Sequence, residues 1–284
     1  MSTLRSGLSL LAVASIGLGS VLVMAPPASA AAAVGSCYEY PLTTVGKVAS
    51  AAPVIGCESP HTAETWWVGT LTPAFGLPSK ASHAARLQAG RPCTTKAMNT
   101  YLGMPDRKLP SRYRNVVLFP TDEQWNAGER WVRCDAVLQS GLHLQQTTGT
   151  AAAFVATVPQ DRLTFCTPGT PSARNTAAVP CTNPKKNWIK VLDKELGGPN
   201  SRFPGTSTVL RRSAVICQKI AKQYDGKVPY PGWWRINPTQ HGWNLGKRSV
   251  QCFVPYDQYL KELAQRAPKP VPTPAPTPTP PPPA

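Results

Sequence analysis

The chain has 284 residues, with 30 Lys or Arg and 14 Asp or Glu, which gives a formal net charge of +16. It also contains 32 Pro and 8 Cys. This length allows one or two domains. Hydrophobic residues make up 42% of the chain and charged residues 15%, so most of the middle should bury a core. Composition therefore excludes a chain that is disordered throughout.

The N-terminus resembles a secretory signal sequence. Arg5 precedes an apolar run at residues 8–24, and two prolines and the triplet Ala-Ser-Ala follow, ending at Ala30. We expect residues 1–30 to be a signal peptide that is cleaved after Ala30. A retained membrane anchor is the alternative, because an apolar run of this length nearly spans a bilayer. The N-terminus of the mature protein, read by mass spectrometry, distinguishes the two.

The remaining sequence indicates a protein outside the cytoplasm. No later segment has enough uninterrupted apolar residues to span a membrane. In an oxidising compartment, an even number of cysteines predicts disulfides. Residues 267–284 contain ten of the 32 prolines, which alternate with Thr, Ala, Lys and Val. This composition predicts a disordered, proline-rich tail that acts as a spacer or docking segment.

Between the leader and the tail, the sequence repeats itself. PTDEQWNAGERWVRC at residues 120–134 aligns without a gap with PTQHGWNLGKRSVQC at residues 238–252, and eight of fifteen positions are identical. Chance would give on the order of one identity. This internal repeat predicts two tandem copies of one domain, at residues 34–146 and 154–266, joined by a small, uncharged junction.

Hydrophobic patterning predicts similar elements in both copies. In the first copy we expect strands at residues 65–71, 115–119 and 131–138, and a helix at 92–102. In the second we expect helices at 207–224 and 256–266, strands at 233–236 and 249–254, and either a strand or a helix at 186–196. The predicted fold class is α+β, with two duplicated, disulfide-bonded domains. Each would be a small, mostly antiparallel sheet with one packed helix.

The cysteines follow the repeat, with four in each copy. The last two cysteines of each copy are expected on the helix and on the final strand, which a helix packed on a sheet brings together. The predicted pairs are Cys93 with Cys134, Cys217 with Cys252, Cys37 with Cys57, and Cys166 with Cys181. Each bridge would stabilise the fold by roughly 2–4 kcal/mol.

Trp125 and Trp243 recur at the same place in both copies, each followed by a glycine and an arginine. We interpret them as a requirement of the fold rather than as ligand-binding residues. The glycine three residues later predicts a turn before the last strand, with the tryptophan covering the sheet edge.

Two segments resemble a known family. CESPHTAE at residues 57–64 and WNAGERWVRC at residues 125–134, with a cysteine between them, are similar to the septum-formation domain family of actinobacterial envelope proteins. The second copy keeps the closing motif but has Pro184, Lys185 and Lys186 where Pro-His would stand, so it resembles a diverged copy. The resemblance implies an exported or membrane-tethered α+β module associated with cell division, and it implies no known reaction.

Catalytic patterns are missing from the sequence. His61 and Glu64 offer two metal ligands, but H-E-x-x-H and a third ligand at sensible spacing are absent, so we interpret His61 as a hydrogen-bonded residue at a turn. The mature chain also lacks G-x-S-x-G and S-x-x-K. We therefore expect a protein that is not an enzyme and holds no metal or cofactor. The alternative is a cell-wall polysaccharide hydrolase with paired carboxylates drawn from Glu58, Glu64, Asp122 and Glu123.

Charge differs between the two copies. Residues 31–150 contain 11 basic and 8 acidic side chains, whereas residues 151–266 contain 17 and 6. The basic residues of interest are Lys185, Lys186, Lys190, Lys194, Arg211, Arg212, Lys219 and Lys222. They predict a surface for an anionic cell-wall polymer or a membrane surface rather than for nucleic acid, because the protein is exported. A charged surface that only maintains solubility is the alternative.

Trp233 and Trp234 precede Arg235 in a predicted strand. Adjacent strand residues face opposite sides, so one tryptophan would pack inward. The other, beside Arg235, could stack on a sugar ring or contact an envelope protein, unless both belong to the core. The sequence thus predicts a non-catalytic, secreted envelope protein that takes part in septum or cell-wall assembly through polymer or protein binding.

Overall fold

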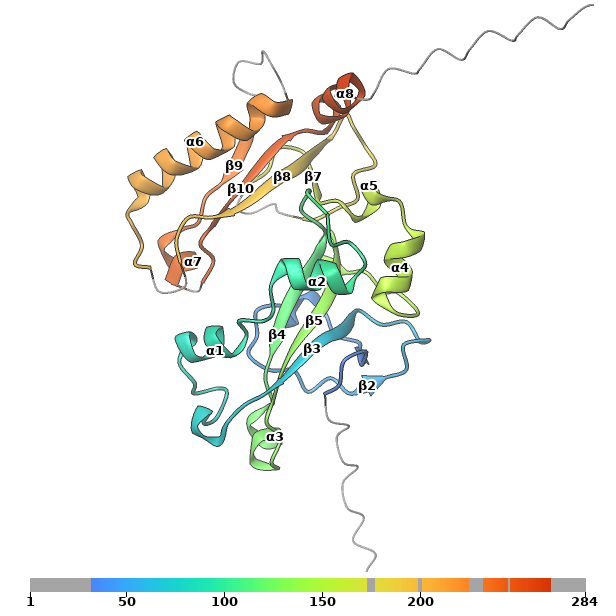
Figure 1. The fold of residues 1–284 in the computed structure, drawn as a ribbon, viewed down its shortest axis with the longest axis vertical. Helices are drawn as coiled ribbons and strands as arrows, with labels where there is room; N and C mark the ends of the chain where they lie inside the picture. The colour runs from blue at the N-terminus through green and yellow to red at the C-terminus, as the bar shows by residue number, and fades with distance from the viewer. Residues whose placement is uncertain (1–31, 173–176, 199–200, 225–231, 245, 267–284) are drawn as a thin grey trace, which may run out of the picture. The chain divides into compact units, whose positions relative to one another are not determined.

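A computed structural model describes residues 32–172, 177–198, 201–224, 232–244 and 246–266 (Figure 1). The predicted signal peptide and proline-rich tail lie outside these residues. Within them, helices pack on antiparallel sheets, so the predicted α+β class is confirmed. None of the helices in this part of the chain is both long enough and apolar enough to cross a membrane.

The first sheet has the strand order β2-β1-β3-β5-β4, and β6 pairs with β5. Its strands are β1 (Cys37–Tyr38), β2 (Val54–Ile55), β3 (Ala63–Thr70), β4 (Tyr113–Leu118), β5 (Trp131–Ser140) and β6 (His143–Leu144). The helical segments of this part are η1 (Leu42–Thr44), η2 (Pro73–Phe75), α1 (His83–Ala89), α2 (Thr95–Tyr101), α3 (Asp122–Asn126), α4 (Ala151–Thr157) and α5 (Gln160–Leu163). The three predicted strands are confirmed as β3, β4 and β5, and the predicted helix as the shorter α2.

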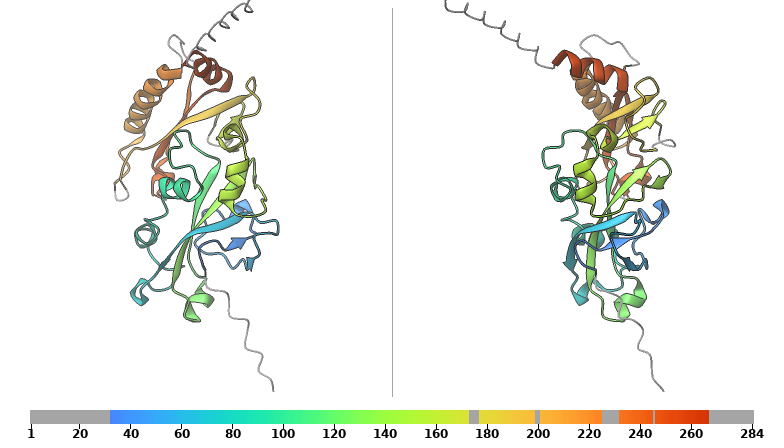
Figure 2. Two further views of the ribbon diagram at one scale, coloured as in Figure 1. Left: turned by 45° about the vertical axis from the view of Figure 1, so that its right-hand side comes forward. Right: turned by 90° about the vertical axis from the view of Figure 1, so that its right-hand side faces the viewer.

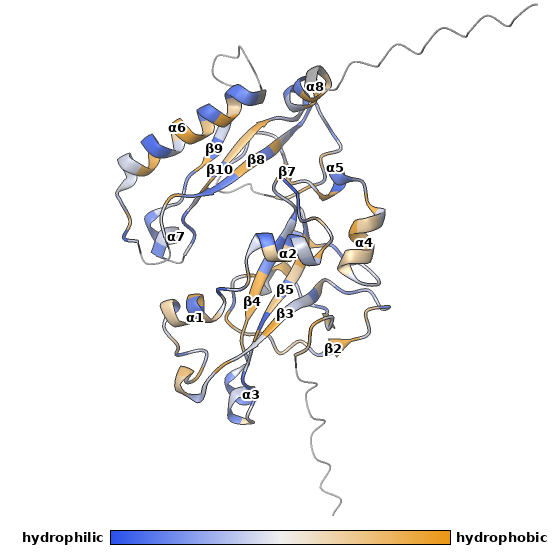
Figure 3. Ribbon diagram, viewed as in Figure 1, coloured by the Kyte–Doolittle hydropathy of each residue, from blue (hydrophilic) through white to orange (hydrophobic). Residues whose placement is uncertain are grey.

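Strand β5 is the centre of the first core because both of its faces are covered. Cys134, Ala136 and Leu138 pack in one cluster with residues of α2 and α4, whereas Trp131 and Val137 pack in another with the segment that leads into β3. Successive strand residues point to opposite faces, so this two-sided burial explains why β5 carries apolar residues on both faces (Figure 3). Only the charged residues Arg133 and Asp135 interrupt them between Trp131 and Leu138.

The second sheet has the strand order β7-β8-β10-β9. Its strands are β7 (Cys166–Pro168), β8 (Asn187–Glu195), β9 (Trp234–Ile236) and β10 (Ser249–Pro255), and its helices are α6 (Thr206–Tyr224), α7 (Gln240–Asn244) and α8 (Tyr256–Arg266). The ambiguous segment at residues 186–196 is strand β8. Helices α6 and α8 contact each other and share one apolar cluster with β8 and β10 (Figure 2).

The two sheets have the same order of corresponding strands. In each sheet, a short strand that begins with a cysteine lies at one end of this order, and a long strand pairs with it. The strand that carries the last cysteine of that half comes next, and it also pairs with the strand that precedes the short helix. The orders β1-β3-β5-β4 and β7-β8-β10-β9 are therefore equivalent when strands are matched by their place along the chain.

Four disulfides connect the pairs that were expected from the sequence. They are Cys37–Cys57, Cys93–Cys134, Cys166–Cys181 and Cys217–Cys252. Cys217 lies on α6 and Cys252 on β10, as expected for a helix packed on a sheet. Cys93 instead lies just before α2, because that helix begins two residues later than the cysteine. Four disulfides fit an oxidising, extracytoplasmic compartment.

The predicted turn before the last strand is confirmed at Gly128 and at Gly246. The tryptophan before each turn lies on a short helix, α3 or α7, which the sequence did not predict. A threonine caps each helix: the Thr121 hydroxyl accepts from a backbone N–H at 3.3 Å and the Thr239 hydroxyl at 3.0 Å. Gly128 then ends α3 with φ of 100°, a left-handed conformation suited to glycine. The repeated PT…WN…G pattern therefore encodes a capped helix of about one turn.

The predicted junction carries structure of its own. Thr150 caps α4 by accepting a hydrogen bond from Ala153 N–H at 3.2 Å. Ala151 and Val155 of α4, and Leu163 of α5, belong to the core cluster of the first sheet. The first core therefore draws residues from both sides of the predicted boundary.

Candidate functional site

One side of α6 carries the clearest concentration of positive charge. Arg211, Arg212, Lys219 and Lys222 are exposed, while Val209 and Cys217 of the same helix are buried against the sheet. At 3.6 residues per turn, the four basic residues fall within a sector of about 100° and extend over about 16 Å of the helix. We call these four residues the α6 basic face.

Helix α6 itself contributes no acidic residue to the α6 basic face. None of its basic side chains forms an ion pair within the described part of the chain. Val215, which is 64% exposed, lies between these charges. A linear cationic face of this kind attracts polyanions.

Lys190 does not belong to this surface, which corrects the sequence prediction. It is buried on β8, its Nζ lies 4.0 Å from the centroid of the Phe165 ring, and it donates to the Asp193 carboxylate at 3.3 Å. Burial lowers the pKa of Lys190, and Asp193 opposes this effect. Alternation along β8 explains the placement, because Lys190 falls on a covered face of the sheet.

The other predicted lysines lie on different elements. Lys185 and Lys186 are exposed in the turn before β8, and Lys194 is exposed near the end of that strand. The structure therefore groups the four residues of the α6 basic face on one helix, whereas these three lysines belong to the sheet and its turn.

Trp233, Trp234 and Arg235 line a pocket of about 190 Å³ together with Asn237. The two tryptophans are half-buried and pack against different clusters, Trp233 with the α6 side and Trp234 with the Phe253 side of the sheet. The expectation that adjacent tryptophans face opposite sides is therefore confirmed, but neither is exposed, because each packs against a cluster. The guanidinium carbon of Arg235 lies 5.4 Å from the centroid of the Trp233 ring.

This pocket offers polar groups as well as aromatic surface. Arg235 Nε and Asn237 Oδ1 are buried and have no hydrogen-bond partner among the described residues. An unsatisfied donor and acceptor beside a tryptophan can bind a polar ring, such as a sugar, by stacking and hydrogen bonding. The sequence singled out the two tryptophans and Arg235, but no pattern marked Asn237.

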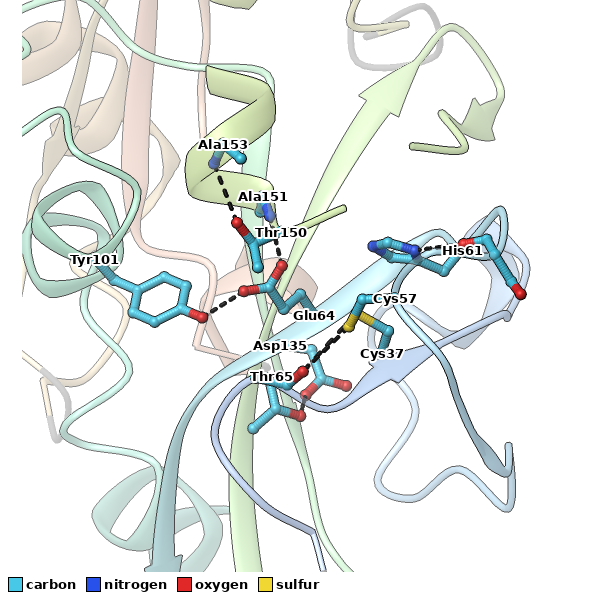
Figure 4. Close-up of a disulfide and its surroundings, with 12 residues drawn as sticks. Cys37, Cys57, His61, Glu64, Thr65, Tyr101, Asp135, Thr150, Ala151 and Ala153 are labelled. Carbon is cyan, nitrogen blue, oxygen red and sulfur yellow. Dashed lines mark hydrogen bonds between the residues drawn. A yellow bond between two sulfur atoms is a disulfide. The ribbon is translucent and has the colours of Figure 1, made fainter. Parts of the chain in front are cut away.

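His61 and Glu64 are both buried. Figure 4 shows their side chains and hydrogen-bond partners. The Nδ1 atom of His61 lies 2.9 Å from Ser59 O, as expected for a histidine at a turn. The Glu64 carboxylate accepts hydrogen bonds from the Tyr101 hydroxyl and from the backbone N–H of Ala151, the first residue of α4. Glu64 thereby connects β3, α2 and α4.

A second buried polar cluster lies around β5. The Asp135 carboxylate, which has no exposed surface, accepts from the Thr65 hydroxyl at 2.7 Å, the Tyr40 hydroxyl at 3.0 Å and Arg133 Nε at 3.2 Å. The Arg133 guanidinium lies over the Tyr38 ring, 3.7 Å from its centroid. Burial raises the pKa of Asp135, and Arg133 and the two hydroxyl donors oppose this effect.

The four carboxylates of the hydrolase alternative lie at three separate places in the fold. Glu58 is exposed in a turn, Glu64 is buried on β3, and Asp122 and Glu123 begin α3. Asp122 accepts a hydrogen bond from the Ser79 hydroxyl at 2.5 Å. Among the described residues that line the cavity at Glu64, the only carboxylate is Glu64 itself.

Comparison with known proteins places one family over most of this fold. The family model described as septum formation matches residues 34–252, which include the first sheet, all of the second sheet except the last three residues of β10, and all four disulfides. No curated protein and no solved structure matches the chain.

Proposed function

Since the chain belongs to the septum-formation family, we propose that it acts outside the cytoplasm in septum formation or cell division as a non-catalytic binding protein. In this proposal, the α6 basic face binds an anionic cell-wall polymer. The observation that carries it is the set of four exposed basic residues on a helix without any acidic residue. Secretion would follow removal of the predicted signal peptide, and the proline-rich tail would act as a spacer.

The Trp233 pocket supports recognition of a polymer that contains sugars. A tryptophan ring, Arg235 and Asn237 offer stacking and hydrogen bonds, which suit a neutral ring next to anionic groups. In this proposal, the basic face supplies most of the attraction and the pocket supplies selectivity. An envelope protein with an acidic surface is the other partner that would fit.

We also infer that the two halves arose by tandem duplication. The identical residues at positions 120–134 and 238–252, the equivalent strand orders and the matching disulfide positions support this inference. The second half would then have gained basic residues and a polymer-binding role after the duplication.

Reversing the charge of two arginines is expected to weaken polymer binding strongly. If Arg211 and Arg212 each contribute about 1 kcal/mol, as basic residues near an anionic surface do, their loss lowers affinity by about thirtyfold, and Arg211→Glu with Arg212→Glu should lower it further. Cosedimentation of the purified protein with cell walls at low salt measures the effect. Binding of the unmodified protein should also disappear near 1 M salt, where the screening length is about 3 Å.

Two controls make this test specific. Arg91→Glu with Lys96→Glu changes the net charge equally at exposed residues of the first half, and it should leave most binding intact. Lys190→Met removes a buried lysine of the second half and should also leave binding intact. Equal losses in all three variants, or binding that ignores ionic strength, would contradict the proposed α6 surface.

The septal role has its own measurement. A fluorescently tagged copy is expected to concentrate at the division site of growing cells, and the Arg211→Glu, Arg212→Glu variant should concentrate there less. Uniform release of the tagged protein into the medium would argue against a septal role, whatever polymer it binds in a purified system.

A further inference from the structure

Three metal-ligating side chains converge beside the Cys37–Cys57 disulfide. Cys37 and Glu64 are direct partners in the antiparallel pairing of β1 and β3, which brings their side chains to the same face. His61 lies just before β3. One ligand atom from each of Cys37, His61 and Glu64 lies within 4.8 Å of the other two. The sequence alone could not supply this third ligand, because Cys37 lies on another strand.

All three side chains are buried, and two have unmet electrostatic or hydrogen-bonding requirements. Cys37, His61 and Glu64 are at most 1% exposed. The Nε2 atom of His61 is buried without a hydrogen-bond partner among the described residues. No ion pair of the described residues involves Glu64. A buried carboxylate and an unpaired imidazole nitrogen together favour a bound cation.

The contacts around His61 and Glu64 are those that orient metal ligands. Nδ1–H of His61 donates to Ser59 O at 2.9 Å, which leaves the lone pair of Nε2 on the side toward Glu64 (Figure 4). Histidines that bind metals commonly donate their other N–H to a backbone carbonyl in this way. The hydrogen bonds from Tyr101 and Ala151 likewise hold the Glu64 carboxylate in place.

A small cavity adjoins His61 and Glu64, and Cys37 is not among its lining residues. It has a volume of about 10 Å³ and is lined by His61, Glu64 and Tyr113, among others. The Tyr113 hydroxyl is also buried without a partner among the described residues. This volume holds one water molecule or one ion. A larger ligand does not fit.

The oxidation state of Cys37 determines whether the cluster can bind a metal ion. In the disulfide, the Cys37 sulfur is not a thiolate and is a poor metal ligand. We propose that reduction of the Cys37–Cys57 disulfide converts this cluster into a site for one divalent cation of the zinc class, bound by the Cys37 thiolate, His61 Nε2 and the Glu64 carboxylate. Sulfur, imidazole and carboxylate ligands suit zinc, and a water in the cavity can complete a tetrahedron.

The redox step balances with an external dithiol. Two electrons and two protons from the dithiol break the Cys37–Cys57 bond and form two thiols, and the dithiol becomes a disulfide. The cation then displaces the proton of the Cys37 thiol to solvent. Exchange with the disulfide form of the same dithiol, which takes up the two electrons and two protons, reverses both steps and releases the cation. The site therefore couples metal occupancy to the redox state, and it does not depend on polymer binding.

Cysteine substitution tests the proposal without reducing the other disulfides. Cys57→Ser leaves Cys37 as the single unpaired cysteine. This variant is expected to bind one equivalent of Co²⁺, with a thiolate-to-cobalt charge-transfer band, and Zn²⁺ should displace the Co²⁺. The unmodified, oxidised protein should show no such band. The mirror variant Cys37→Ser, whose Cys57 thiol is only half-buried, should also lack the band.

A histidine pair supplies the matched control. Adding His61→Ala to Cys57→Ser should weaken Co²⁺ binding by more than about tenfold, whereas adding His143→Ala, which removes an exposed histidine, should change nothing. Absence of stoichiometric Co²⁺ in Cys57→Ser, or equal binding after His61→Ala, would mean that the cavity holds only water and would overturn the proposal.

The test requires that the Cys57→Ser variant keeps its fold. Far-ultraviolet circular dichroism should show that Cys57→Ser retains the unmodified spectrum. If it does not, the same Co²⁺ titration is done on the unmodified protein after mild reduction, with mass spectrometry used to select conditions in which only Cys37 and Cys57 are reduced. A missing charge-transfer band there overturns the proposal equally.

Discussion

Replacement of Asp135 by alanine is expected to lower the free energy of unfolding by about 3–5 kcal/mol. The substitution leaves the buried Arg133 guanidinium without its carboxylate and removes the acceptor of the Thr65 and Tyr40 hydroxyls. The two hydroxyls that lose their acceptor account for part of this loss, because a buried donor without a partner costs about 1–3 kcal/mol. Urea denaturation with all disulfides intact measures the change in the free energy of unfolding. The slope of this free energy against urea concentration should be the same in the variant and the unmodified protein.

An exposed ion pair provides the comparison. Asp257 accepts from Lys261 on α8, where their side chains are 43% and 72% exposed, so Asp257→Ala should cost less than about 0.5 kcal/mol. Replacing both charges, with Arg133→Met and Asp135→Leu, should cost less than the sum of the two single changes, because no unpaired charge remains. Similar costs for Asp135→Ala and Asp257→Ala would show that the cluster around Asp135 does not stabilise the fold.

Replacement of Trp243 by alanine should destabilise the protein by about 3–5 kcal/mol as well. Trp243 is 1% exposed, its ring contacts Phe203 edge-on with centroids 5.7 Å apart, and its indole N–H donates to Ser201 O at 2.8 Å. A Cβ on Gly197 would lie 2.6 Å from the ring, so the backbone there approaches it closely. Alanine would leave a cavity and an unpaired carbonyl.

A conservative change separates these two contributions. Trp243→Phe keeps most of the ring but loses the hydrogen bond to Ser201, so it should cost about 1–2 kcal/mol less than alanine does. Trp234→Ala, at a half-buried tryptophan of the same sheet, should cost less than Trp243→Ala. Thermal or urea unfolding measures both. If Trp243→Ala unfolds at the same midpoint as Trp234→Ala, the repeated tryptophan does not anchor the core.

The parts of the fold that follow from local pattern could be predicted from the sequence. The stripe of apolar residues in α6 and the apolar runs of β4 and β5 gave these elements their correct type. A helix packed on a sheet was sufficient to pair Cys217 with Cys252. The short strands β1 and β7 were not predicted, because two or three residues are too few to show an alternating hydrophobic pattern. They become strands only by pairing with the neighbouring strands of the sheet.

The candidate sites show the same limit. The α6 basic face follows from helical spacing and could be predicted, whereas the burial of Lys190 depends on which face of β8 is covered. Spacing also predicted that His61 and Glu64 lack a third ligand. Only the pairing of β1 with β3 brings Cys37 to them, and no local pattern specifies this pairing.

The contact between Glu64 and α4 has a consequence for dissecting the chain. A fragment that stops at residue 146, where the repeat predicts the end of the first copy, lacks the Ala151 N–H that donates to Glu64. It also lacks Val155 and Leu163, which help to cover the first sheet. The predicted first copy of the repeat thus ends at residue 146, whereas the first hydrophobic core extends to Leu163. A stable N-terminal fragment must run at least to Leu163, and a protease cut between residues 146 and 151 would leave the first sheet with an open flank.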